Sequence, residues 1–205
     1  MTQASPPKLP RSLRTATLVC LMLSAMVGFI SAGESLSLVH FSELREARIF
    51  RLPGIGETAA LDAGLIRALE PMRTSRALTL AALSIACAFS FVAAGRLLYP
   101  SGLSRENMRR LLVGSLLAVA LLRTIEGAQW AVVMRRVAGE MGKAFVTFSG
   151  NREQLPDEQV RQLIPPLALA AAIFQTLLVV GTFVLFSRYF GSPRVQQMVS
   201  STSQD

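Results

Sequence analysis

The sequence predicts an all-α integral membrane protein: a bundle of four transmembrane helices, with short amphipathic helices in the outer loops. Hydrophobic residues make up 51% of the 205 residues and charged residues 17%, whereas about 25% charged residues is usual for a soluble domain. The apolar residues gather in four blocks, and about 20 residues suffice for a helix to cross ~30 Å of hydrocarbon. The blocks do not alternate between apolar and polar residues, which excludes the strands of a membrane barrel.

The chain opens with a polar, Pro/Ser-rich tail, residues 1–14, which is expected to be disordered. The first membrane helix is expected over residues 15–33, where Ser24, Gly28 and Ala32 recur at helical spacing. Because helices in lipid associate through small residues, this spacing favours a helix that stays in the bundle. The alternative is a cleaved signal peptide, indicated by the basic leader and by the small residues of "ISAGES". The apolar stretch exceeds the usual length of about 7–15 residues, which favours retention.

An outer loop is expected over residues 34–76, and it contains a short helix. The turn residues "PGIG" precede Leu61, Leu65 and Leu69, whose spacing predicts a helix with one apolar stripe. Pro71 then ends this helix. Such a stripe lies either on the membrane surface or against the bundle.

The second membrane helix is expected over residues 77–95 and the third over residues 111–134. An inner loop, residues 96–110, joins them, and Ser104 is expected to cap a helix that leads into the third block. Small residues again share one stripe of the second helix, and they are Ala82, Ala86, Ser90 and Ala94. These stripes indicate a compact bundle rather than independent spans.

A second outer loop is expected over residues 135–162, with a turn at Gly150 and a helix start at Pro156, where two acids follow in the first turn. The fourth membrane helix is expected over residues 163–187. Pro165 and Pro166 are expected near its start, where proline is tolerated. Its small residues are Ala168, Ala172 and Thr176, and residues 188–205 form a second cytoplasmic tail.

The distribution of basic residues predicts that both termini are cytoplasmic. On that topology the inner segments, 1–14, 96–110 and 188–205, hold nine Lys/Arg and two acidic residues, while the two outer loops hold eleven and ten. A cytoplasmic excess of Lys/Arg accompanies membrane insertion, so the net charge of +8 does not indicate nucleic acid. Four arginines run against the rule by flanking helices on the outer side: Arg73, Arg76, Arg135 and Arg136. The short loops fit a bacterial inner (plasma) membrane.

Two opposite charges lie inside the third apolar block. At ~1.5 Å per residue, Arg123 is about 18 Å from Leu111, near the bilayer centre, where an isolated charge costs at least ~2.5–3.5 kcal/mol. Glu126 follows on the same helix face, so each charge is expected to be neutralised mainly by the other. Gln129 extends this face, and Gln175 of the fourth helix lies at a matching depth. The predicted intramembrane polar layer consists of Arg123, Glu126, Gln129 and Gln175.

This layer has two interpretations. It either fixes how the third and fourth helices align, which buried polar groups can do at a cost in stability, or it lines a path or pocket for an ion, proton or polar head group. The self-compensating pair on one helix favours the first interpretation. A packed layer would support it, and a water-accessible cavity reaching Arg123 would support the second.

The residue inventory predicts that the chain is not an enzyme and that it uses no cofactor, metal or catalytic residue. His40 is the single histidine, which excludes a bis-His haem and a zinc site of the HExxH type within this chain. All three aspartates lie outside the apolar blocks, and no phosphate-binding glycine motif or CxxC is present. Cys20 and Cys87 lie inside apolar blocks and are expected to be packing residues.

The predicted role is that of an accessory or scaffold subunit that assembles through helix–helix contacts. Its expected partners are the lipid bilayer and either a second copy or another membrane protein, and no nucleic acid. One alternative is a transporter or channel component that uses the Arg123/Glu126 layer, which would require oligomerisation because four short helices rarely enclose a path. Another is a membrane sensor whose segment 34–76 reads the outer side.

Overall fold

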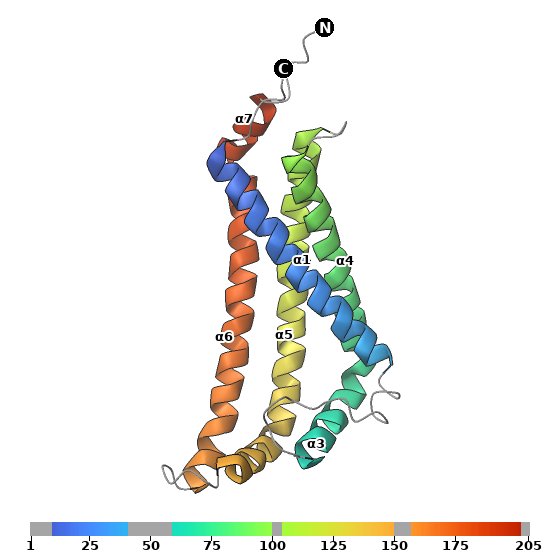
Figure 1. Ribbon diagram of the computed structural model, residues 1–205, viewed down its shortest axis with the longest axis vertical. Coiled ribbons are helices and arrows are strands. Elements are labelled where there is room, and N and C mark those ends of the chain that lie inside the picture. Colours follow the sequence, from blue (N-terminus) through green and yellow to red (C-terminus); the bar gives the residue numbers. More distant parts are fainter. Residues whose placement is uncertain (1–9, 41–58, 100–103, 150–156, 202–205) are drawn as a thin grey trace. The chain divides into compact units, whose positions relative to one another are not determined.

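A computed structural model describes residues 10–40, 59–99, 104–149 and 157–201. Within these residues the chain is almost entirely helical and contains no strand, which confirms the all-α fold class. The elements in chain order (Figure 1) are α1 (Arg11–Val39), α3 (Ala59–Leu69), the 3₁₀ turn η1 (Glu70–Met72), α4 (Arg73–Leu98), α5 (Arg105–Ser149), α6 (Asp157–Gly191) and α7 (Pro193–Ser201).

Four stretches of helix are long and apolar enough to cross a membrane, over Arg11–Val39, Gly64–Leu98, Arg105–Ala138 and Pro165–Gly191. The chain is therefore an integral membrane protein with the four spans that the sequence predicts. The helices continue past their apolar blocks, and α5 reaches 45 residues. This extension is physically reasonable because a helix makes its backbone hydrogen bonds internally, in lipid or in water. An apolar block therefore predicts the part of a helix that crosses the membrane, but it does not predict the residues at which the helix begins and ends.

Several local predictions are confirmed. The short helix of the first connection is α3, and Pro71 lies in the turn η1 that follows it. Helix α5 begins directly after Ser104, and α6 begins at Asp157, after Pro156. The turns predicted at residues 53–56 and at Gly150 lie outside the described residues, as does most of the first tail.

Two features of the C-terminal region differ from expectation. Pro165 and Pro166 lie inside α6 rather than near its start, because the helix begins at Asp157. No helix is predicted in the second tail, yet α7 forms there. Ser192 precedes α7, and its Oγ accepts a hydrogen bond from the Val195 N–H at 3.5 Å. Proline in the first helical position completes a common helix start.

The described residues belong to two compact units, and each contains segments of all four long helices. Unit 1 comprises residues 1–32, 81–122 and 179–205. In its core, α1 approaches α4 so closely at Gly28 that an added Cβ would lie 2.9 Å from the Cβ of Cys87. The Ser90 hydroxyl of α4 is 2.9 Å from that of Ser115 on α5. The small residues predicted to bring helices together therefore do so in this unit.

Unit 2 comprises residues 33–80 and 123–178. Its core includes Leu69 of α3, with Leu65 packed against it. The apolar stripe of α3 therefore lies against the helices of this unit rather than on the membrane surface. Helices α5 and α6 meet at Gly127, where an added Cβ would lie 2.4 Å from Cγ2 of Thr176. Any larger residue there would force the Thr176 side chain to shift.

Candidate functional site

The polar centre of unit 2 is the carboxylate of Glu126 on α5, whose side chain is only 7% exposed. Its Oε1 accepts a hydrogen bond from Nη2 of Arg76 at 3.0 Å, and its Oε2 accepts one from Nη1 of Arg123 at 2.6 Å. Each carboxylate oxygen therefore has its own guanidinium partner. Charge-assisted bonds of this kind are the strongest hydrogen bonds that side chains make.

Arg76 is the most enclosed charged side chain of this cluster, with 5% of its surface exposed. The same Nη2 lies 3.5 Å from Oε2 of Glu34, which is half-exposed. Its guanidinium lies over the ring of Trp130, with its central carbon 4.5 Å from the ring centroid. That distance is within the range of a cation–π interaction. Arg76 thus joins a buried carboxylate, a half-exposed carboxylate and an aromatic face.

Contacts between the end of α1 and the start of α4 position Arg76. The Ser35 hydroxyl donates to the carbonyl of Ala77 at 3.0 Å. Arg73 donates from Nε to the carbonyl of Leu38 at 2.7 Å and from Nη2 to the carbonyl of Val39. The last carbonyls of a helix have no partner within the helix, and arginine supplies one here. These bonds fasten the two helix ends to each other and bring Arg76 near Glu34.

The predicted polar layer is only partly assembled in this way. Arg123 and Glu126 pair as expected, but Arg76 shares the carboxylate, so the pair is not closed on itself. Gln129 joins through α4, its Nε2 donating to Oγ1 of Thr79 at 3.3 Å. Gln175 has an exposed side chain on α6. Among the described residues, the one charged partner that the α5 pair gains outside its own helix is Arg76 of α4, and none comes from the fourth membrane helix.

Two members of the cluster come from helix ends. Arg76 is in the first turn of α4, and Glu34 is close to the end of α1. Arg123 and Glu126 lie in the interior of α5, as the apolar block predicts. Charges near helix ends cost less than charges at mid-depth. This lowers the cost of Arg76 and Glu34 in the cluster.

Sequence reasoning missed Arg76 and Glu34 because both resemble ordinary charges at a membrane boundary. A usable signal was nevertheless present. The two residues flank the same outer connection with opposite charges. When two consecutive membrane helices form a hairpin, the residues flanking their connection are brought together, so an ion pair there is a reasonable prediction.

Three buried polar atoms near this carboxylate have no hydrogen-bond partner among the described residues: Nη1 of Arg76, Nε of Arg123 and Oε1 of Gln129. Each has less than 1 Å² of accessible surface. Because a neighbouring space able to hold water would expose such atoms, the cluster is packed tightly around them. The cluster can hold the helices that contribute to it in register, and its three unpartnered polar atoms are enclosed by protein.

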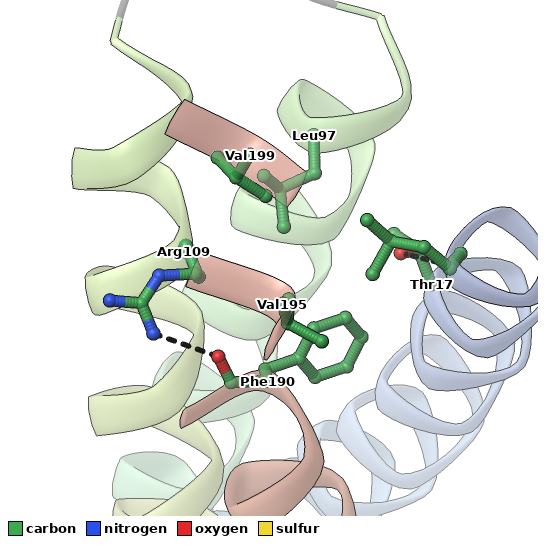
Figure 2. A pocket seen from close by; sticks show the side chains of 7 residues that line it. Thr17, Leu97, Arg109, Phe190, Val195 and Val199 are labelled. Atoms are coloured by element: carbon green, nitrogen blue, oxygen red, sulfur yellow. Dashed lines mark hydrogen bonds between the residues drawn. The ribbon is translucent and has the colours of Figure 1, made fainter. Parts of the chain in front are cut away.

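Unit 1 contains a second set of charges around Arg109. This residue binds Glu106 through Nε and Nη2, both at 2.8 Å, and donates from Nη1 to the carbonyl of Phe190 at 2.8 Å. Figure 2 shows Arg109 and Phe190 beside Thr17, Leu97 and the two valines of α7. The small space among them has no room for a water molecule. Arg109 therefore stabilises the end of α6 by binding the carbonyl of Phe190.

Among the described residues, no three His, Cys, Asp or Glu side chains lie close enough to hold a metal ion. The chain matches no protein-family model, no curated protein and no solved structure. The function is accordingly argued from the geometry of the two units.

Proposed function

We propose that this membrane protein is an accessory or scaffold subunit, which acts through lateral helix–helix contacts with a partner in the bilayer. The observation that carries the proposal is a contrast between polar and apolar surfaces. The Glu126 carboxylate is enclosed with an arginine on each oxygen, whereas the apolar surface of α6 is largely uncovered. Only 6% of the apolar window in the α6 span is buried, against 39% for the window in the span containing α4.

The ionic cluster supports this role as an anchor. Both oxygens of Glu126 bind arginine, and the fastened ends of α1 and α4 hold one of these partners, Arg76, in place. A buried salt bridge of this kind specifies register more than it adds stability. The cluster therefore keeps the surface of unit 2 in one shape, which a binding surface requires.

The exposed side of α6 in unit 2 suits helix packing. It carries large apolar residues beside two exposed alanines, and these are Leu167, Ala170, Ala171, Phe174, Leu177 and Leu178. Membrane helices associate by van der Waals contact around small residues, because water expulsion gives no drive between them in lipid. A partner helix seated on the alanines would be held by the flanking side chains.

A crosslinking scan tests this proposal. A photoreactive amino acid is placed at each position from 170 to 178 in the full chain, in native membranes. A protein partner gives a discrete adduct that recurs every three to four positions, as one helix face requires. The matched change Ala171→Trp should abolish the adduct, whereas Phe29→Trp, on an exposed position of α1, should leave it. Adducts to lipid alone at every position would contradict a scaffold role.

A transporter or channel component is the second candidate. The observation in its favour is the set of unpartnered buried polar atoms near Glu126, since intramembrane ionisable groups are functional candidates. A chain with Cys20→Ala and Cys87→Ala carries Gln129→Cys as its single thiol. Under the scaffold proposal, charged thiol reagents do not react with it in intact membranes and do react after denaturation. Rapid reaction in intact membranes would favour the transport role.

A further inference from the structure

A groove lies between α1 and α6 in unit 1, within the membrane spans of both helices. It holds about 290 Å³ and is lined by Ala16, Thr182, Leu185, Phe186 and Tyr189. This volume is close to the lower limit of the ~300–1,000 Å³ usual for small-molecule sites. The lining is mostly apolar, with the hydroxyl groups of one threonine and one tyrosine. Its surface suits a hydrocarbon chain better than a polar solute.

The same unit carries a large excess of positive charge at one end. The start of α1, the end of α4, the start of α5, the end of α6 and α7 all meet there (Figure 2). The described arginines of unit 1 are Arg11, Arg14, Arg96, Arg105, Arg109, Arg110, Arg188 and Arg194. Among the described residues of this unit Glu106 is the single acid, and it is already bound by Arg109 and Arg110. An anionic partner would complement this boundary.

Three of these arginines belong to the helices that form the groove, and they are Arg11, Arg14 and Arg188. Arg188 directly precedes Tyr189 of the lining, and Arg11 lies in the first turn of α1, about one and a half turns before Ala16. Both side chains are exposed. A guanidinium can bind two phosphate oxygens at once, and its long stem can lie along an apolar surface while the charge stays at the membrane boundary. An apolar groove on two helices whose ends carry exposed guanidinium groups matches the two parts of a phospholipid.

We propose that this groove binds one acyl chain of an anionic phospholipid, whose phosphate is held by Arg188 and Arg11. The acyl chain lies against Leu185 and Phe186, and the head group lies at the arginine-rich end of unit 1. Basic pockets between membrane helices recognise anionic head groups in this way. The inference goes beyond the scaffold role, because it concerns lipid recognition by unit 1 and uses no residue of the α6 surface in unit 2.

Native mass spectrometry of the full chain tests the proposal. The protein is delipidated in detergent and then supplied with phosphatidylglycerol or with phosphatidylcholine that has the same acyl chains. Retention of the anionic lipid should be roughly tenfold stronger, because both lipids carry a phosphate but the choline cation of phosphatidylcholine cancels its charge beside the arginines. Equal retention of the two lipids would overturn the proposal. Displacement of phosphatidylglycerol by millimolar inorganic phosphate would also overturn it, since the site would then recognise a free anion.

Filling the groove should weaken binding of the lipid chain. Ala16→Trp, or the milder Ala16→Leu if the first variant unfolds, is expected to reduce retention of phosphatidylglycerol by roughly tenfold, comparable with the loss of two or more buried CH₂ contacts. The matched control is Ala88→Trp, which adds the same bulk at an exposed position of α4 outside the groove. Unchanged retention in both Ala16 variants, with thermal unfolding like that of the parent, would contradict the groove as the site.

Removing the charges should erase the preference for the anionic head group. The double variant Arg11→Gln/Arg188→Gln is expected to bind phosphatidylglycerol no better than phosphatidylcholine. The control Arg96→Gln/Arg110→Gln removes the same net charge from α4 and α5, which do not line the groove, and should keep the preference. If only the control variant loses its preference for phosphatidylglycerol, the head group is recognised by α4 and α5, and the proposal is overturned.

Discussion

At Glu126, desolvation and ion pairing act in opposite directions. Removing a carboxylate from water costs several kcal/mol, and the attraction of nearby cations compensates only when the geometry is good. The two guanidinium contacts at 3.0 and 2.6 Å supply that geometry. Arg76 and Arg123 in turn depend on the carboxylate, since both are largely withdrawn from water. Glu34, on the same arginine, is half-exposed and can be solvated instead.

Glu126→Gln is therefore expected to be much more harmful than Glu34→Gln. The first removes the only described carboxylate that Arg123 binds and leaves the enclosed Arg76 with the half-exposed Glu34 alone, so it should lower the free energy of unfolding by about 3–5 kcal/mol. The second removes a half-exposed partner and should cost about 0–1 kcal/mol. Thermal or denaturant unfolding of the purified protein in detergent measures both.

A triple change separates an architectural role from a transport role at this residue. Arg76→Leu/Arg123→Leu/Glu126→Leu removes all three enclosed charges together, and apolar replacements of this kind are often neutral or stabilising. We expect it to recover most of the stability lost in Glu126→Gln and to keep the α6 crosslink. A triple variant that is stable but has lost a cellular phenotype, with that crosslink retained, would contradict the purely architectural role.

At the scale of elements, α7 shows how a short amphipathic segment becomes structure. An isolated helix of nine residues is marginal in water, and α7 has that length. Its Val195 and Val199 are each 1% exposed in the core of unit 1. Burial of this face, together with the Ser192 cap, stabilises the helix. The signal was available in the spacing of the valines after a serine and a proline.

Disrupting the buried face of α7 should destabilise unit 1. Val195→Asn places an amide in an apolar core, and a buried polar group without a partner costs about 1–3 kcal/mol. The neighbouring exposed change Gln196→Asn should stay within about 0.5 kcal/mol of the parent. Thermal unfolding and protease resistance of the last helix measure the difference. Equal behaviour of the two variants would mean that α7 does not contribute to the core.

The elements also show which features a single sequence can predict. Apolar length predicted all four membrane spans, and capping chemistry predicted the starts of α5 and α6. The partners of the buried charges could not be found by matching depths within apolar blocks, because Gln175 faces away while Arg76 comes from a helix end. Which charges pair depends on which helix ends are held together. The hydrogen bonds that hold these ends use backbone carbonyls, and no sequence pattern predicts them.

At the scale of the whole molecule, the two units differ in the charges that they contain. Unit 2 contains the enclosed cluster of opposite charges, and unit 1 contains arginines with one acidic partner among its described residues. Each unit draws on all four long helices, so the division runs across the helices and not between them. With four spans we expect the two ends of the chain to lie on the same side of the membrane, and the charge of unit 1 predicts which side that is.

We expect both termini to be cytoplasmic. All described arginines of unit 1 lie near the predicted inner boundary, and short Lys/Arg-rich segments stay on the cytoplasmic side during insertion. A fluorescent protein fused after Asp205 should therefore fluoresce, while alkaline phosphatase at the same place should be inactive. A phosphatase fusion within residues 41–58 of the predicted outer loop should be active, which controls for expression.

Because orientation follows the Lys/Arg bias, replacing Arg96, Arg105, Arg109 and Arg110 with glutamine should produce a mixture of the two orientations. An active phosphatase fused after Asp205 in the parent chain would contradict this topology.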